Sequence, residues 1–143
     1  MLEWAIHSNM KPRGEAVILG SGTSTGVPVL GFEYPPEFLA EPKNHRLRPS
    51  LLLKGPTGNV VVDCTPDFRG QMLRENVLDL EAAIITHTHA DHIMGMDDLR
   101  SYSLKSKLPV PVYSLPCYLD DIRRVFPYAF GDFPPGVEVP RFE

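Results

Sequence analysis

The 143-residue sequence predicts a single α/β domain, in which helices are layered on a mixed β-sheet. Short runs of Val, Ile and Leu recur along the chain and alternate with segments of helical periodicity. Fifteen prolines are too many for an all-helical bundle, because proline breaks helix interiors. With 43% hydrophobic residues, a chain of this size has enough apolar side chains for one core. We therefore expect residues 1–143 to form one domain.

The predicted strands are short apolar runs that end at glycine, proline or polar residues. They cover residues 16–19, 50–54, 59–63, 82–86 and 110–113. The sequence Gly-Pro-Thr-Gly joins the second and third runs as a hairpin, which makes the sheet mixed. Near-continuous Leu and Val runs predict strands that are buried on both faces. Pro111 places the last strand at a sheet edge, because proline cannot donate a ladder hydrogen bond.

Helical spacing predicts three helices, over residues 66–77, 91–102 and 116–126. The first helix would bury Phe68, Met72 and Leu73 on one side. The remaining segments predict loops. A glycine-rich loop covers residues 20–28, an irregular segment with four prolines covers 31–49, and residues 130–143 are weakly patterned.

Composition argues against several classes of partner. The net charge of −4 argues against nucleic acid as a partner, since binding to phosphates needs clustered cations. No apolar run approaches the roughly 20 residues that span a bilayer, and the N-terminus lacks the pattern of a signal peptide. Two cysteines fit a reduced, cytoplasmic protein, in which we expect Cys64 and Cys117 to be small buried residues.

Three of the five histidines lie in the sequence Thr-His-Thr-His-Ala-Asp-His at residues 86–92, directly after a predicted strand. An extended backbone would point His87 and His89 to the same side. A helix beginning near Asp91 would then present Asp91 and His92 beside them. Imidazole and carboxylate donors suit zinc, iron or manganese. A solvated polar turn is the alternative, but this density of donors favours metal binding.

This motif resembles the signature of the metallo-β-lactamase-fold hydrolases. The resemblance extends from about Val17 onward, and it is greatest to the branch that contains phosphoribosyl 1,2-cyclic phosphate phosphodiesterase. Further segments of the sequence follow in the order of that family: residues 19–28, 48–52, 62–63, 66–69 and 95–100.

The resemblance implies the N-terminal half of an αββα sandwich and a site for two divalent ions, zinc or manganese. His87 and His89 would bind the first ion, and Asp91 and His92 the second. A hydroxide bridging the two ions would be the nucleophile. Asp91 would orient this hydroxide and accept its proton as the catalytic residue. Asp63 would fix the loop that carries the ligands.

The family completes its site with later residues that this chain does not provide. No histidine follows His92, His7 and His45 lie upstream, and the aspartates up to Asp132 come too early for the bridging position. We therefore expect an incomplete domain whose C-terminal half is absent and whose inner sheet face is uncovered. Alone it should bind metal weakly and hydrolyse nothing at a useful rate. A complementing C-terminal half or a second copy would complete it.

Three residues are weaker candidates for substrate binding. Thr23 and Ser24 lie in the glycine-rich loop, which could expose amides to a phosphate or simply allow a tight turn. Arg100 could contact an anionic substrate, although an ion pair with neighbouring carboxylates is the more common role. His45 is expected in a solvated loop. Many members of the branch that this sequence resembles carry a cysteine cluster for a structural zinc after the glycine-rich loop, but residues 29–36 contain no cysteine, so no structural zinc is expected.

Three functions remain open. The first is a phosphodiesterase that acts on a small or cyclic phosphodiester. The second keeps the metals but attacks a carbonyl, as in a thioester, lactone or β-lactam. The third is a non-catalytic fragment that binds metal or a partner. RNase activity is less expected, because no basic surface for RNA is visible in the sequence.

Overall fold

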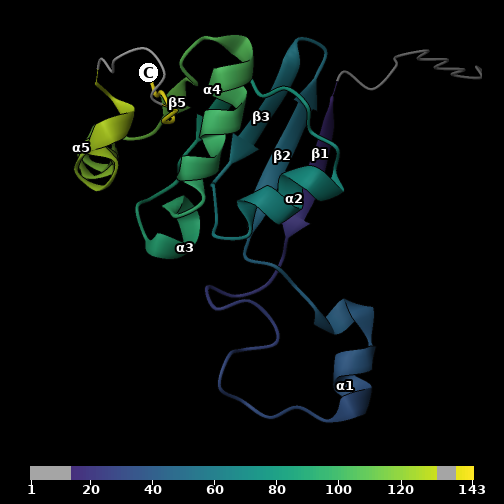
Figure 1. Cartoon of the computed structure of the whole chain (residues 1–143). Coiled ribbons are helices and arrows are strands. Elements are labelled where there is room, and N and C mark those ends of the chain that lie inside the picture. The colour runs from purple at the N-terminus through teal and green to yellow at the C-terminus, as the bar shows by residue number, and fades with distance from the viewer. Residues whose placement is uncertain (1–13, 132–137) are drawn as a thin grey trace, which may run out of the picture.

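The computed structural model describes residues 14–131 and 138–143. These residues form one five-stranded sheet and the helices packed on it (Figure 1). The strands lie side by side in chain order. The first three pair antiparallel and the last three pair parallel, so the predicted α/β class with a mixed sheet is confirmed. The strands are β1 (Glu15–Gly20), β2 (Ser50–Gly55), β3 (Gly58–Val62), β4 (Ala82–Ile84) and β5 (Val112–Tyr113).

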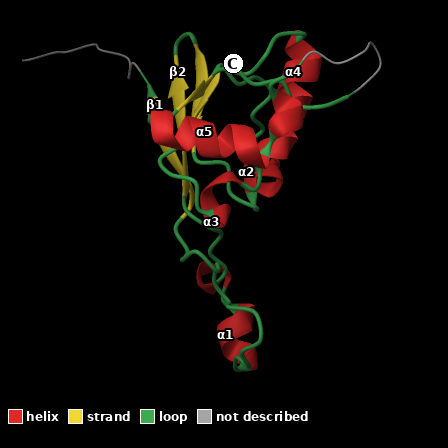
Figure 2. Ribbon diagram, turned by 90° about the vertical axis from the view of Figure 1, so that its left-hand side faces the viewer, coloured by secondary structure: helices red, strands yellow, loops and turns green. Residues whose placement is uncertain are grey.

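Short helices cover one face of this sheet. Both views show α2 and α4 on the same side of the strands (Figures 1 and 2). Short 3₁₀ turns cover Pro42–Asn44, Met96–Leu99 and Pro127–Ala129. The helices are α1 (Pro36–Ala40), α2 (Phe68–Arg74), α3 (Ala90–Ile93), α4 (Arg100–Ser106) and α5 (Pro116–Val125). No described helix is long and apolar enough to cross a bilayer.

The core lies between the sheet and the helices. The register sets Leu52 opposite Val17 and Val61, and Val61 beside Ala83, so these side chains share one face. Leu52, Val61 and Ala83 are fully buried there. Burying a side chain such as Leu52 contributes about 1.5–3 kcal/mol. The helical layer and its turns add the buried side chains of Phe68, Met72, Ile93, Met96, Leu99 and Ile122.

The other face of the sheet is open, so the prediction of strands buried on both faces is wrong. Ile18 on β1 is 68% exposed and Tyr113 on β5 is 61% exposed, and Leu53 and Ile84 are also exposed between them. No described element covers these side chains, because the helices pack on the opposite face (Figure 2). An uncovered apolar face agrees with the expected half of a sandwich, and such faces mark sites of interaction.

The first predicted helix is shorter than expected. It ends at Arg74 because Asn76 adopts a left-handed conformation, with φ of 50°, and the Val77 amide donates to the Met72 carbonyl at 3.0 Å. This hydrogen bond is that of a Schellman C-cap. Phe68 and Met72 are buried as predicted, whereas Leu73 is 63% exposed, which contradicts its assignment to the core.

The second predicted helix, residues 91–102, is broken at Gly95 into α3, a 3₁₀ turn and α4. The Gly95 amide donates to the Cys64 carbonyl at 2.9 Å, which takes it out of a continuous helix ladder. A β-carbon at Gly95 would lie 2.0 Å from the Thr65 carbonyl oxygen. The segment after β3 therefore docks into this break, and only glycine permits the approach.

Residues 27–46 form an arm that projects beyond the end of the sheet (Figures 1 and 2). Reciprocal hydrogen bonds of 2.9 Å between Val27 and Arg46 close its base. The irregular segment that the prolines predict thus contains α1 and a 3₁₀ turn. His45 Nε2 lies 2.7 Å from the Leu39 carbonyl oxygen, which gives this exposed histidine a role inside the arm.

The chain's last residues extend the sheet beside β5. The amide of Val112 donates to the Glu143 carbonyl at 2.7 Å, and Val110 forms a parallel bridge with Phe142. β5 is the last named strand in the sheet order, as Pro111 predicts, and residues 141–143 pair along its outer side. Cys64 is fully buried as expected, but Cys117 is exposed at the start of α5, so its predicted burial is wrong.

Candidate metal centre

The candidate site lies at one end of the sheet, beyond the carboxyl ends of several strands. β1, β3, β4 and β5 run in the same direction, so their carboxyl ends lie at this end of the sheet. Ligands of α/β proteins bind beyond the carboxyl ends of the strands. Asp63 follows β3 and residues 86–92, here called the metal loop, come just after β4. β2 runs in the opposite direction and begins at this end of the sheet, so Arg48, two residues before β2, lies at the same end.

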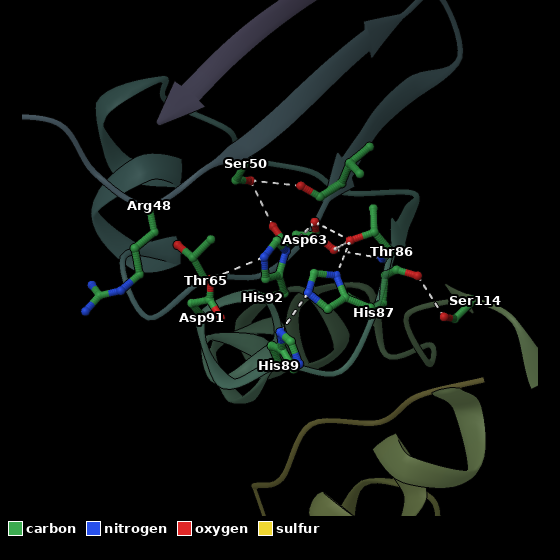
Figure 3. A network of polar contacts seen from close by, with 12 residues as sticks. Arg48, Ser50, Asp63, Thr65, Thr86, His87, His89, Asp91, His92 and Ser114 are labelled. Atoms are coloured by element: carbon green, nitrogen blue, oxygen red, sulfur yellow. Dashed lines mark hydrogen bonds and ion pairs between the residues drawn. The ribbon is translucent and has the colours of Figure 1, made fainter. Parts of the chain in front are cut away.

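Asp63 links the end of β3 to the metal loop (Figure 3). It adopts a left-handed conformation with φ of 64°, which aspartate tolerates better than most residues. Its Oδ1 accepts the Thr86 amide at 2.8 Å, and its Oδ2 accepts the Thr86 hydroxyl at 2.8 Å. The same Oδ2 lies 2.8 Å from His92 Nδ1. One buried carboxylate thus holds both ends of the loop.

His92 and Asp91 form the first of two pairs of candidate metal ligands, which are called donor pairs below. Because Nδ1 of His92 donates to Asp63, its Nε2 keeps a lone pair. This Nε2 lies 3.2 Å from Asp91 Oδ2. One nitrogen and one carboxylate oxygen therefore meet at the same point, and both side chains are largely buried.

His87 and His89 form the second pair. The Thr86 hydroxyl donates to Asp63 and lies 3.0 Å from His87 Nδ1, from which it can accept a hydrogen bond. This arrangement leaves His87 Nε2 with a lone pair directed at His89 Nδ1, 3.2 Å away. The His87 and His92 rings lie 4.0 Å apart between centroids, so the two pairs adjoin.

The chemistry of these donors fits zinc or manganese, which take imidazole nitrogen and carboxylate oxygen. The donors stand in two pairs and do not form one complete shell. Among residues 14–131 and 138–143, no three histidine, cysteine or carboxylate side chains are grouped so as to hold an ion. Each pair therefore supplies two protein donors, and a four-coordinate ion needs two more.

Cys64 lies next to this site without joining it. Complete burial, and secondarily the nearby charge of Asp63, raise the pKa of the Cys64 thiol far above its ordinary value. The thiol stays protonated, and a protonated thiol is a poor metal ligand.

Contacts from distant segments hold the metal loop in place, and sequence analysis missed them. The Thr88 hydroxyl donates to Asp121 on α5 at 3.1 Å. The Ser114 hydroxyl donates to the Ile85 carbonyl at 2.7 Å. These partners are about 30 residues away in sequence, and no local pattern marks Asp121 or Ser114.

The structure places the predicted substrate-binding residues in fixed local contacts. Thr23 Oγ1 lies 2.9 Å from Thr25 Oγ1 in the glycine-rich loop, and the Ser24 carbonyl accepts from Arg48. A β-carbon at Gly22 would lie 2.5 Å from the Arg46 carbonyl oxygen, so glycine has a steric reason here. Arg100 pairs with Asp97 at 3.2 Å, in agreement with the ion-pair alternative. Substrate contacts of Thr23, Ser24 and Arg100 stay predictions.

Two residues named in the sequence analysis, His7 and Asp132, lie outside the described part of the chain.

The comparisons with known proteins cover the same site. Residues 58–143, more than half of the chain, match the family described as a beta-lactamase superfamily domain. This range includes the whole metal loop and Asp63.

Known relatives are longer than this chain. An octanoyltransferase of Porphyromonas gingivalis is 40% identical over 122 residues, 84% of this chain and 24% of that protein. The crystal structure of a diphosphatase from the PhnP family is 39% identical with a TM-score of 0.75, over 80% of this chain and 46% of its own. Zinc-bound PqqB from Methylobacterium extorquens shares the fold at 22% identity and a TM-score of 0.63, over 90% and 44%. This chain spans less than half the length of each.

Proposed function

This chain belongs to the beta-lactamase superfamily, and we propose that it carries the metal loop of a metal-dependent hydrolase acting on a small or cyclic phosphodiester. The observation that carries the proposal is the arrangement of two adjoining donor pairs on one loop, held by Asp63. The similarity to a PhnP-family diphosphatase supports phosphate as the group attacked. The zinc in the PqqB structure supports a divalent ion.

Each donor pair has a defined part in this proposal. His87 and His89 would hold one zinc or manganese ion, and Asp91 and His92 a second. Such ions, when bound, lower the pKa of water and offset the negative charge of a phosphodiester. Asp63 keeps the proton on His92 Nδ1, and Asp91 orients the attacking water and accepts its proton.

The open sheet face belongs to the same proposal. The relatives contain additional residues, and a complementing half or a second copy of this chain would cover Ile18, Leu53, Ile84 and Tyr113. The same partner would supply the donors that each pair lacks. Without it, we expect weak metal binding and no useful turnover.

A chimera tests the proposed activity. This chain would replace the matching segment of the PhnP-family diphosphatase, which is 39% identical. We expect the chimera to hydrolyse bis-p-nitrophenyl phosphate when loaded with zinc or manganese. His89→Ala should reduce this rate at least about 100-fold, whereas His45→Ala in the arm should leave it unchanged. A folded, metal-loaded chimera that does not cleave phosphodiesters contradicts the proposal.

A second candidate is attack on a carbonyl, as in a thioester or lactone. The observation in its favour is the 40% identity to a protein whose name describes acyl transfer. The same chimera separates the two functions, since hydrolysis of an octanoyl thioester without hydrolysis of the phosphodiester favours the carbonyl substrate.

A further inference from the structure

The middle of the metal loop is tied to the rest of the fold by one side chain, that of Asp121 on α5. Asp63 holds the loop at its two ends. Between these ends, the Thr88 hydroxyl donates to Asp121 Oδ2 at 3.1 Å. Among the residues that the structure describes, this is the only hydrogen bond that joins residues 87–89 to another segment of the chain.

Thr88 lies between His87 and His89, here called the histidine pair, so its direction bears on theirs. The two rings lie 4.7 Å apart between centroids, and His87 Nε2 lies 3.2 Å from His89 Nδ1. Side chains alternate along an extended backbone, and His89 is extended, with φ of −65° and ψ of 149°. The contact that draws Thr88 to α5 therefore directs both imidazoles to the other side of the backbone, towards each other.

The helix α5 is a firm support for this contact. It has ten residues, and Ile122, next to Asp121, is fully buried in the core. The Ser114 hydroxyl, just before the helix, donates to the Ile85 carbonyl at 2.7 Å, directly after β4 (Figure 3). Asp121 also forms an ion pair with Arg124, three residues later on the same helix. Both the helix and the carboxylate are therefore fixed relative to the loop.

We propose that Asp121 is a positioning residue which, through Thr88, sets the affinity of the histidine pair for a divalent ion. This inference rests on the proposed function and deepens it. Two imidazoles that are held together before the ion arrives lose less conformational entropy on binding it. The coupling is reciprocal, so an ion on the histidine pair also stabilises the contact and thereby α5. An aspartate that only anchors α5 predicts neither effect.

A zinc titration of the full 143-residue chain tests this role, followed by NMR through the ring ¹H–¹⁵N signals of the histidines. Signals of the histidine pair report one ion, and those of His92 report the other. We expect Asp121→Ala to weaken zinc binding at the histidine pair about tenfold, and to change binding at His92 by less than about twofold. Asp121→Asn should restore part of the affinity, because its amide oxygen still accepts from Thr88. The matched control is Asp120→Ala, which removes an exposed carboxylate of the same helix that pairs with Arg123, and it should leave both affinities unchanged.

Two further measurements separate positioning of the loop from anchoring of the helix. Backbone hydrogen exchange in α5 should slow when zinc binds the parent or Asp120→Ala, and should not respond to zinc in Asp121→Ala. Thr88→Val removes the donor of the same hydrogen bond and should weaken zinc binding as much as Asp121→Ala. The double variant should lose no more affinity than either single variant, because both remove one interaction.

The outcomes separate this inference from the proposed function. Equal zinc affinity of the parent and Asp121→Ala at the histidine pair overturns the role of Asp121 and leaves the proposed metal loop standing. An equal loss at both donor pairs, or an equal loss in Asp120→Ala, has the same consequence. If the histidine pair of the parent does not respond to zinc at all, the assignment of the metal loop fails, and the role of Asp121 fails with it.

Discussion

Asp63 is the residue on which the geometry of the metal loop depends most. It accepts hydrogen bonds from Thr86 and His92, and it has the left-handed φ of 64° that links β3 to the next segment. The sequence places an aspartate after a strand, but its contacts depend on the parallel pairing of β3 with β4. That pairing brings together residues more than 20 positions apart.

Replacing Asp63 separates its electrostatic role from its backbone role. Asp63→Asn keeps a side chain that tolerates a left-handed φ but removes the charge facing His92. We expect zinc affinity to fall about 10–100-fold, measured by competition with a chromophoric chelator. Asp79→Asn, which changes an exposed carboxylate paired with Lys105, is the control and should bind zinc normally. Unchanged affinity in Asp63→Asn contradicts the role of Asp63.

The two cysteines should differ sharply in reactivity. Burial raises the pKa of Cys64 far above its ordinary value, so its thiol stays protonated at pH values where an exposed thiol ionises. Cys117 is exposed. We expect one thiol per folded chain to react with Ellman's reagent at pH 8, and the second only after unfolding. Two equally fast thiols in the folded protein are inconsistent with this structure.

The raised pKa of Cys64 also predicts a pH dependence of stability. Above the ordinary thiol pKa of about 9, the unfolded chain loses the Cys64 proton while the folded chain keeps it. Its contribution is therefore present below pH 9, and the free energy of unfolding falls as the pH rises above 9. Urea titrations between pH 8 and 10 measure this fall, which Cys64→Ala should reduce.

At the scale of elements, Gly95 determines how the metal loop meets the rest of the fold. A helical pattern continues through residues 91–102, but the structure breaks there because Gly95 packs against Thr65 and donates to Cys64. Helical periodicity cannot reveal this contact, since its partners follow a different strand. The glycine itself is the local signal, although a glycine inside a helix pattern has several explanations.

Two glycine substitutions test this explanation. Gly95→Ala would place a β-carbon 2.0 Å from the Thr65 carbonyl oxygen, so we expect a loss of about 2–4 kcal/mol in the free energy of unfolding. Gly70 lies inside α2 with nothing within 4 Å of its added β-carbon. Gly70→Ala should therefore be neutral or stabilise by up to about 1 kcal/mol. Urea denaturation measures both changes, and equal stability of the two variants would refute the packing argument.

At the scale of the whole molecule, the main feature is the sheet with one covered and one open face. Sequence runs of Leu and Val identify the strands well, but they cannot say whether both faces are covered within this chain. The metal motif is local and was found from six consecutive residues, 87–92. Arg48, Asp121 and Ser114 were not, because their contacts form only when distant segments meet at the sheet edge.

We expect the chain to self-associate through the open sheet face, and one charged substitution on that face should weaken this association. Ile18→Lys places an ammonium group on β1, the edge strand of the apolar face, so we expect less concentration-dependent association by analytical ultracentrifugation. Leu73→Lys is the control, since Leu73 is similarly exposed on the helical side. Equal effects of the two substitutions, or none from Ile18→Lys, count against the open face as an interaction surface.

The measurement that tests the central claim most directly is a calorimetric titration of this chain with zinc and, separately, with manganese. Two donor pairs on one loop predict two weak binding events per chain. Replacing His87 and His89 by alanine should remove one event and leave the other, and replacing Asp91 and His92 should do the reverse. Binding that is unaffected by either double substitution, or no binding at all, would contradict the assignment of the metal loop.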